Sequence, residues 1–179
     1  MENILKKKLT IVVEIFLLIF IPSFFSFGQI PFNDVYGKKE NYKISIPKDY
    51  SRKEAVGAYV DLKFVNNQGF SIVTVVKTGP AGLKSSDIEF MANASDYDVK
   101  KGLEATGLSN ITILNKGLIE INDYPSGFIY YTDGDLYFHA ITQFRKGKVI
   151  NLTFTCTLSE RNSNMAYIYR VINSLKWLK

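Results

Sequence analysis

Few residues in this sequence have side chains suited to covalent or metal chemistry. The chain has one histidine, His139, and one cysteine, Cys156. A Ser-His-Asp or Cys-His system would need His139 as its base, with a nucleophile within hydrogen-bond reach. Alternation of apolar and polar residues directs His139 toward solvent on its strand, whereas it directs Cys156 into the core, where a thiol is inert. A zinc site here would need carboxylates for most of its ligands. The sequence therefore predicts no catalytic residue, no cofactor and no metal site.

The glycine-rich segment 79–85 has the position of a phosphate loop, between a predicted strand and a predicted helix. Only two residues separate Gly79 from Gly82, whereas a Walker loop has four residues between its glycines. Pro80 also removes one of the backbone N–H donors that such a loop uses. We expect an ordinary connecting loop.

The acidic segments 96–98 and 133–135 do not continue into the twelve-residue calcium loop. We expect the first on a solvated helix face and the second at a hairpin tip. One enzymatic alternative remains open: a hydrolase that uses dispersed carboxylates such as Asp61 or Asp133.

Aromatic residues supply the candidate binding surface. Tyr137 and His139 are predicted to project from the solvent-facing side of one strand, with Tyr131 or Tyr130 beside them on the neighbouring strand. Tyr124 lies at a predicted turn. Tyrosine combines a large contact area with a polar tip and is enriched in binding surfaces. The candidate surface is Tyr124, Tyr131, Tyr137 and His139; the alternative is that helices cover this face and the tyrosines belong to the rim of the core.

The N-terminal residues predict export. Lys6, Lys7 and Lys8 precede an apolar core over residues 15–27, and residues 26–28 fit the small-x-small pattern before a cut ahead of Gln29. We expect residues 1–28 to be a signal peptide, residues 29–40 a flexible lead-in, and residues 41–179 a single domain, periplasmic or extracellular. The alternative is an uncleaved membrane anchor. The formal charge of +5 does not indicate a nucleic-acid partner.

The order of elements predicts the fold class. The predicted elements are a strand at 42–47, a hairpin of 58–65 and 70–77, a helix at 86–106, a four-strand meander over 111–158 and a helix at 159–178. Residues 70–77 are apolar on both sides, so we expect that strand to be covered on both faces. A bulge or a bend is predicted at residues 115–117 and a turn at 123–127. The class is α+β, with an antiparallel β-sheet of about six to seven strands flanked by two main helices.

Residues 42–50, an opening strand that ends in proline, and the element order that follows them resemble the PsbP-like fold of exported and organellar proteins. The resemblance covers residues 40–178 and concerns the order of elements rather than site motifs. It implies an α/β/α sandwich and a non-catalytic binding or assembly role with a protein or cell-envelope partner. We therefore expect an exported, non-enzymatic domain without a stable membrane span after signal cleavage. The hydrolase and a membrane-tethered structural subunit are the alternatives.

Overall fold

The computed structural model describes residues 31–80 and 84–178. The predicted signal peptide, residues 1–28, lies outside the described residues. The flexible lead-in predicted for residues 29–40 is wrong at Phe32–Tyr36, which forms strand β1. Strand β1 pairs antiparallel with β2 (Tyr42–Pro47), and β2 pairs on its other side with β10 (Lys176–Trp177). This small sheet brings the first and last strands of the described chain together.

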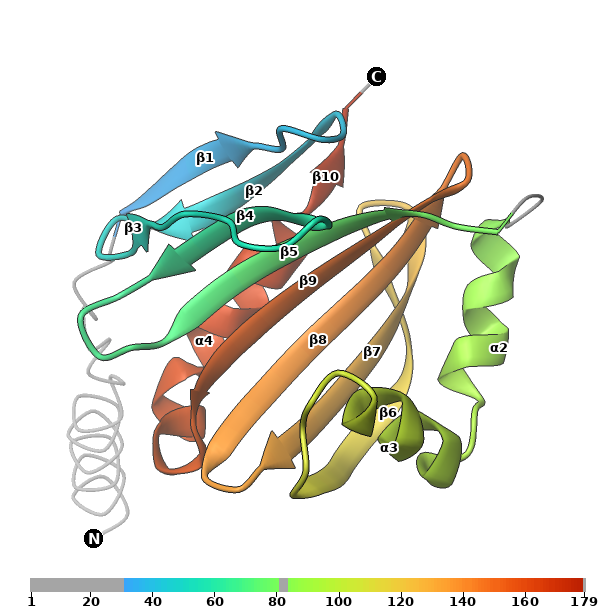
Figure 1. Cartoon of the computed structure of the whole chain (residues 1–179). Coiled ribbons are helices and arrows are strands. Elements are labelled where there is room, and N and C mark those ends of the chain that lie inside the picture. Colours follow the sequence, from blue (N-terminus) through green and yellow to red (C-terminus); the bar gives the residue numbers. More distant parts are fainter. Residues whose placement is uncertain (1–30, 81–83, 179) are drawn as a thin grey trace, which may run out of the picture. The chain divides into compact units, whose positions relative to one another are not determined.

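The other strands form one seven-stranded antiparallel sheet (Figure 1). They are β3 (Ser51–Arg52), β4 (Val60–Val65), β5 (Ser71–Thr78), β6 (Ile111–Ile121), β7 (Tyr124–Asp133), β8 (Leu136–Arg145) and β9 (Lys148–Thr157). Their order across the sheet is β3-β4-β5-β9-β8-β7-β6, so the pairing of β5 with β9 joins the early hairpin to the late meander. The predicted α+β class with an antiparallel sheet is confirmed.

Two-residue turns connect the strands of the meander. The turn between β6 and β7 consists of Asn122 and Asp123, whose φ angles of 50° and 66° are left-handed. Asn and Asp tolerate this conformation, which a type I′ hairpin requires at both positions. The turn predicted at residues 123–127 is therefore wrong, because β7 already begins at Tyr124. A bulge is present in β6, with its register shift between Ile113 and Asn115.

The helix predicted for residues 86–106 is wrong as one continuous element. It consists of a 3-10 turn at Ser85–Asp87, α2 (Ile88–Ala92) and α3 (Asp96–Glu104). Ser95 interrupts the helix because its backbone is extended and its side chain accepts a hydrogen bond from the Asp98 N–H at 3.1 Å. A serine cap of this kind starts a new helix.

The C-terminal helix is also shorter than predicted. A 3-10 turn at Leu158–Glu160 leads into α4 (Arg161–Asn173), and the chain then extends into β10 instead of continuing as helix. Among the described residues, no helix has the length and apolar character needed to cross a bilayer.

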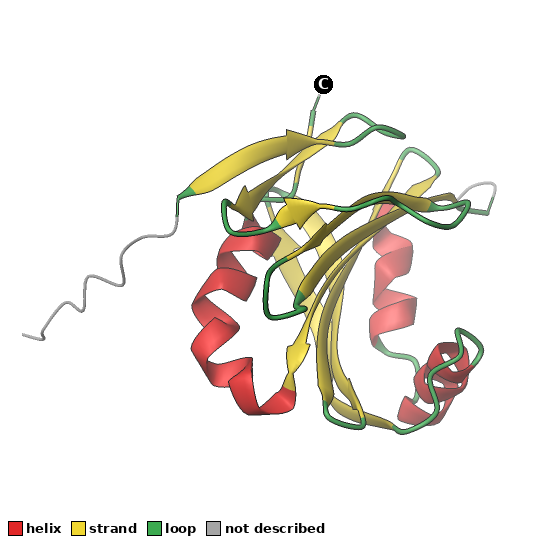
Figure 2. Ribbon diagram, turned by 60° about the vertical axis from the view of Figure 1, so that its left-hand side comes forward, coloured by secondary structure: helices red, strands yellow, loops and turns green. Residues whose placement is uncertain are grey.

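The seven-stranded sheet lies between α4 on one face and α2 with α3 on the other (Figure 2). The core lies on the α4 side. Its buried side chains include Ile72, Ile141, Leu152 and Phe154 from the sheet, Ile168, Val171 and Ile172 from α4, and Tyr42 and Ile44 from β2. Burial of each such apolar side chain contributes about 1.5–3 kcal/mol relative to exposure.

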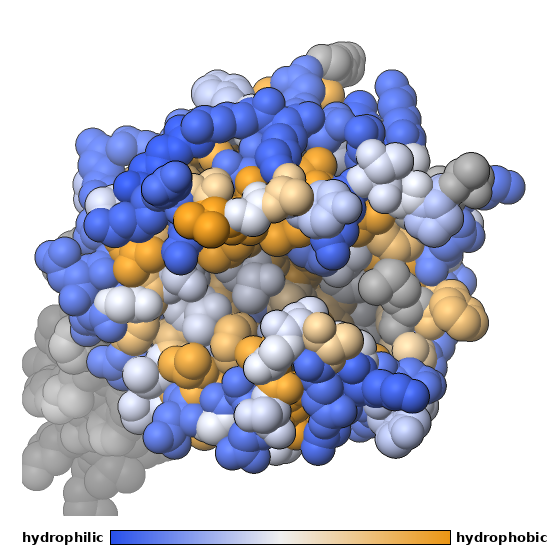
Figure 3. Space-filling view, viewed as in Figure 1, coloured by the Kyte–Doolittle hydropathy of each residue, from blue (hydrophilic) through white to orange (hydrophobic). Residues whose placement is uncertain are grey.

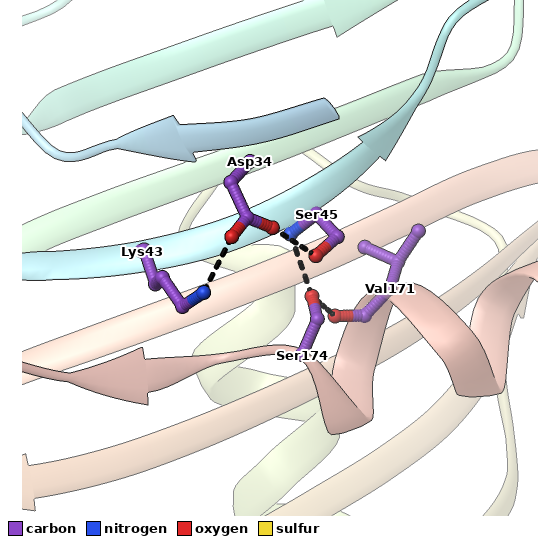
Figure 4. Close-up of polar contacts among 5 residues, drawn as sticks. All are labelled: Asp34, Lys43, Ser45, Val171 and Ser174. Atoms are coloured by element: carbon purple, nitrogen blue, oxygen red, sulfur yellow. Dashed lines mark hydrogen bonds and ion pairs between the residues drawn. The ribbon is translucent and has the colours of Figure 1, made fainter. Parts of the chain in front are cut away.

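Polar contacts fix the small sheet to the end of α4 (Figure 4). The Ser45 N–H donates to Ser174 Oγ at 2.7 Å, and that hydroxyl donates to the Val171 carbonyl at 2.6 Å. On β1, Asp34 pairs with Lys43 and accepts a hydrogen bond from Ser45 Oγ at 2.6 Å. These hydrogen bonds from Lys43 and Ser45 lower the pKa of the Asp34 carboxyl. The contacts therefore set the position of β2 relative to α4.

Gln143 connects both sheets through buried hydrogen bonds. Its Oε1 accepts from Trp177 Nε1 at 2.9 Å, and its Nε2 donates to Ser126 Oγ at 2.9 Å and to the Ile121 carbonyl at 3.3 Å. The side chain is fully buried. A buried amide in this position fixes β10 against β7 and β8.

We expect Gln143→Leu to lower the free energy of unfolding by about 2–3 kcal/mol, because the buried indole N–H of Trp177 loses its acceptor. Urea denaturation followed by circular dichroism measures this change. Gln68→Leu, at an exposed turn, is the matched control and should change stability by less than about 0.5 kcal/mol. Equal effects of the two substitutions would contradict the structural role of Gln143.

Candidate functional site

The candidate surface of Tyr124, Tyr131, Tyr137 and His139 is not one surface in the structure. Tyr137 and His139 are 0% and 1% exposed, so the prediction that they face solvent is wrong. They lie opposite Cys156 and Phe154 on β9. Directly paired residues share a sheet face, and this face is the one that α4 covers. The alternative explanation from the sequence, that a helix covers the aromatic residues, applies to Tyr137 and His139.

His139 lies in an aromatic environment between the sheet and α4. Its ring centroid is 3.9 Å from that of Tyr130 and 5.8 Å from that of Tyr169. Burial, together with the smaller effect of the positive charge of Arg161, lowers the pKa of His139 to about 3. Burial likewise raises the pKa of the Cys156 thiol to about 11. At neutral pH the imidazole is a very weak base and the thiol is protonated, so these residues do not form an activated nucleophile–base pair.

Tyr131 and Tyr124 lie elsewhere. Tyr131 points to the opposite face of the sheet, where it stacks on Phe138 with ring centroids 4.7 Å apart. Burial raises the pKa of its hydroxyl to about 12. Tyr124 is half-buried at the start of β7, with the Arg145 guanidinium 5.5 Å from its ring centroid. The four residues thus belong to three different environments.

The carboxylates considered for a hydrolase bind backbone N–H groups. Asp61 is 2% exposed and accepts hydrogen bonds from the N–H groups of Lys38 and Lys39. Asp133 accepts from the Asn110 N–H at 2.7 Å. Each carboxylate therefore has a structural task in holding a loop. Within the described part of the chain, no three His, Cys, Asp or Glu side chains are grouped so as to hold a metal ion.

The sheet face opposite α4 stays partly open over β5, β9 and β8. Along each of these strands, buried residues on the α4 side alternate with half-buried residues on the other side. The prediction that β5 is covered on both faces is therefore wrong. We define the open sheet face by nine half-buried residues: Ser71, Val73, Val75, Phe138, Ala140, Thr142, Asn151, Thr153 and Thr155. Figure 3 shows this side of the molecule as a central hollow bordered by hydrophobic and intermediate residues, with hydrophilic residues farther out.

Strand register arranges the open sheet face in three cross-strand rows. Thr153 pairs with Val73 on one side and with Ala140 on the other, which makes it the central residue. All nine side chains are uncharged, whereas Lys63 on β4 lies beside Val73 at the border. The surface is thus uncharged and formed mostly by short hydroxyl and aliphatic side chains, with Phe138 and Asn151 among them.

Helix α2 limits the open sheet face on the β7 side. Ile88 packs so closely on Gly127 that a Cβ atom at position 127 would lie 3.2 Å from the Ile88 side chain. A small cavity of about 90 Å³ lies at this junction, lined by Ile88, Val99, Ile129 and Thr142 among others. The close approach explains why glycine occupies position 127 and allows α2 to rest on the sheet.

Period-two alternation in the sequence located these strands but did not identify the open face. Both sides of β5 carry Thr or Val, so hydropathy did not distinguish the covered side of this strand from the open one. The available signal was the absence of large apolar residues from one side: Thr153, Thr155 and Asn151 alternate with Leu152, Phe154 and Ile150.

Comparison of folds finds two informative solved structures. The solution structure of cyanobacterial PsbP (CyanoP) from Synechocystis sp. PCC 6803 has a TM-score of 0.68 and 15% identity, over 88% of this chain and 99% of that chain. The crystal structure of LpqN from Mycobacterium tuberculosis, described as involved in cell envelope biogenesis, has a TM-score of 0.55 and 12% identity, over 84% and 92%. No protein-family model matches the sequence, and a search of curated proteins finds no match. At these identities the likeness concerns the fold.

Proposed function

We propose that this chain, which has the PsbP-like fold, is an exported, non-catalytic binding or assembly domain whose protein partner contacts the open sheet face. LpqN, with a similar fold, is described as involved in cell envelope biogenesis. The predicted signal peptide supports export. The environments of His139 and Cys156 support a role without nucleophilic catalysis.

The observation that carries the proposal is the uncharged composition of the open sheet face. The buried centre of a protein–protein interface is depleted of charged residues and surrounded by a polar rim. The nine residues of the open sheet face match such a centre, and hydrophilic residues occupy the outer part of this side in Figure 3. We therefore assign an uncharged protein surface as the occupant, because a charged one would lose water here without gaining an opposite charge.

The test begins with a photo-cross-linking residue in place of Ala140, in the full chain expressed in its native host. We expect one protein to be cross-linked at this position. The same protein, once purified, should bind the wild-type chain in a calorimetric titration. Thr153→Lys, at the centre of the open sheet face, should weaken this binding at least about tenfold, since it buries a charge without a partner.

Thr112→Lys is the matched control, because Thr112 is an exposed strand residue outside the open sheet face. It should leave the affinity unchanged, and circular dichroism should show that both variants are folded. If the partner binds Thr153→Lys as tightly as wild type, the open sheet face is not its docking site. Cross-linking to glycan or lipid alone would contradict a protein occupant.

A further inference from the structure

A second hollow differs from the uncharged open sheet face, because cationic side chains line it. The cavity has a volume of about 270 Å³ and lies where the turn between β8 and β9 meets β10 and the loop between β1 and β2. Lys146 comes from the turn, Arg145 and Lys148 from the strand ends on either side of it, Glu40 from the loop and Trp177 from β10. We call this cavity the basic pocket.

The charges of the basic pocket do not cancel. Lys148 Nζ lies 3.2 Å from Glu40 Oε1, which pairs one cation with the one acidic side chain of the lining. Among the described residues, neither Arg145 nor Lys146 forms an ion pair with a carboxylate. Three cationic side chains and one carboxylate leave a net charge of two positive units, which attracts an anion into the cavity.

Arg145 is held in place before any ligand arrives. Its Nη1 donates to the Leu178 carbonyl at 2.9 Å, and its guanidinium carbon lies 5.5 Å and 5.4 Å from the ring centroids of Tyr124 and Trp177. A guanidinium has five N–H donors in a rigid plane, suited to the oxygens of phosphate or carboxylate. Since the side chain is already ordered, binding loses less conformational entropy.

The backbone of the turn provides an independent observation. Lys146 has a φ angle of 48°, and Gly147 follows with 73°. The first position of a type I′ turn favours Asn, Asp or Gly, so a lysine there has a less favourable backbone than those residues would. A contribution of the Lys146 side chain to binding would explain why lysine occupies this turn position.

We propose that the basic pocket binds a phosphate monoester group. Such a group carries about −1.5 to −2 charge at neutral pH, which matches the net charge of the lining. The cavity is slightly smaller than the roughly 300–1,000 Å³ of drug-sized ligand pockets, so it accommodates the phosphate with a small organic part. The phosphate belongs either to a soluble ester or to a lipid headgroup, and the experiment below separates these sources.

Trp177 is the only tryptophan of the chain and lines the pocket, so its fluorescence reports binding directly. The full chain is titrated with glycerol phosphate, with benzoate, and with vesicles of phosphatidylcholine with and without phosphatidic acid. We expect a saturable change with glycerol phosphate for a soluble ester, or with the phosphatidic acid vesicles alone for a lipid headgroup. Benzoate should bind at least about tenfold more weakly than the phosphate probe, because it carries one negative charge.

Lys146→Asn removes a pocket charge and suits the left-handed turn, so the variant should remain folded. It should weaken phosphate binding at least about tenfold, whereas Lys101→Gln, at an exposed position of α3, should leave it unchanged. The proposal is overturned if no phosphate probe gives a saturable change, if Lys146→Asn and Lys101→Gln behave alike, or if benzoate binds as tightly as the phosphate.

Discussion

Replacement of Asp61 by alanine is expected to lower the free energy of unfolding by about 3–5 kcal/mol, the largest effect we expect from one substitution. Asp61 Oδ2 accepts hydrogen bonds from the Lys38 N–H at 3.0 Å and the Tyr42 hydroxyl at 2.6 Å, and Oδ1 accepts from the Lys39 N–H at 3.0 Å. Alanine removes all these acceptors at once. Buried donors without acceptors carry their full desolvation cost.

The same substitution should loosen the loop between β1 and β2, because Asp61 is the acceptor for its backbone at Lys38 and Lys39. Gly37 begins this loop at a position where a Cβ atom would lie 2.2 Å from the Tyr42 ring. Glu40, the acidic side chain of the basic pocket, belongs to this loop. Asp61→Ala should therefore also change the position of Glu40 in the basic pocket, because Glu40 follows Lys38 and Lys39 in the same loop.

Urea denaturation at pH 7 measures the effect of Asp61→Ala. Asp49→Ala, which removes an exposed carboxylate, is the matched control and should change stability by less than about 0.5 kcal/mol. A double-mutant cycle with Tyr42→Phe isolates the contribution of the hydroxyl–carboxylate contact. A loss below about 1 kcal/mol for Asp61→Ala would show that the network is not needed for stability.

Acidification below pH 6.5 is expected to destabilise the fold through His139. The imidazole has an ordinary pKa of 6.5, and burial among the sheet and α4, together with Arg161, lowers it to about 3 in the folded protein. Below pH 6.5 the unfolded chain therefore binds a proton at His139 that the folded chain does not. The free energy of unfolding should fall by about 1.4 kcal/mol per pH unit from this residue, until the pH approaches 3.

His139→Phe separates this effect from the titration of carboxylates, which also occurs in acid. The groups that face His139 are Tyr130 on β7, Tyr137 on β8, and Arg161 and Tyr169 on α4. None of these is a carboxylate that could stabilise a protonated imidazole. Between pH 6.5 and 4, wild type should lose about 3 kcal/mol more than His139→Phe, measured by urea denaturation at each pH.

Carboxylates such as Asp34 contribute to acid sensitivity in both proteins, because Asp34 has a lowered pKa that His139→Phe does not alter. The informative quantity is therefore the difference between the two pH profiles. Parallel profiles would mean that His139 is as accessible to protons in the folded protein as in the unfolded chain.

The sequence by itself determined the elements whose signals are local. Alternation over residues 148–157 predicted β9, and glycine at position 134 marked the hairpin that the structure places there with a φ angle of 57°. The resemblance to the PsbP-like fold also rested on the order of such elements, and the structure confirms it. Each of these features depends on contacts between residues close in sequence, for which residue type alone is informative.

Tertiary structure decided which side of β8 is covered. Alternation separates His139 from Phe138, but only the docking of α4 on the sheet buries His139 and leaves Phe138 on the open side. The basic pocket likewise combines Glu40, Arg145 and Trp177, which lie on three separate segments. The free energy that brings these segments together comes from the burial of apolar residues that are far apart in sequence. A local sequence pattern therefore does not predict which segments meet.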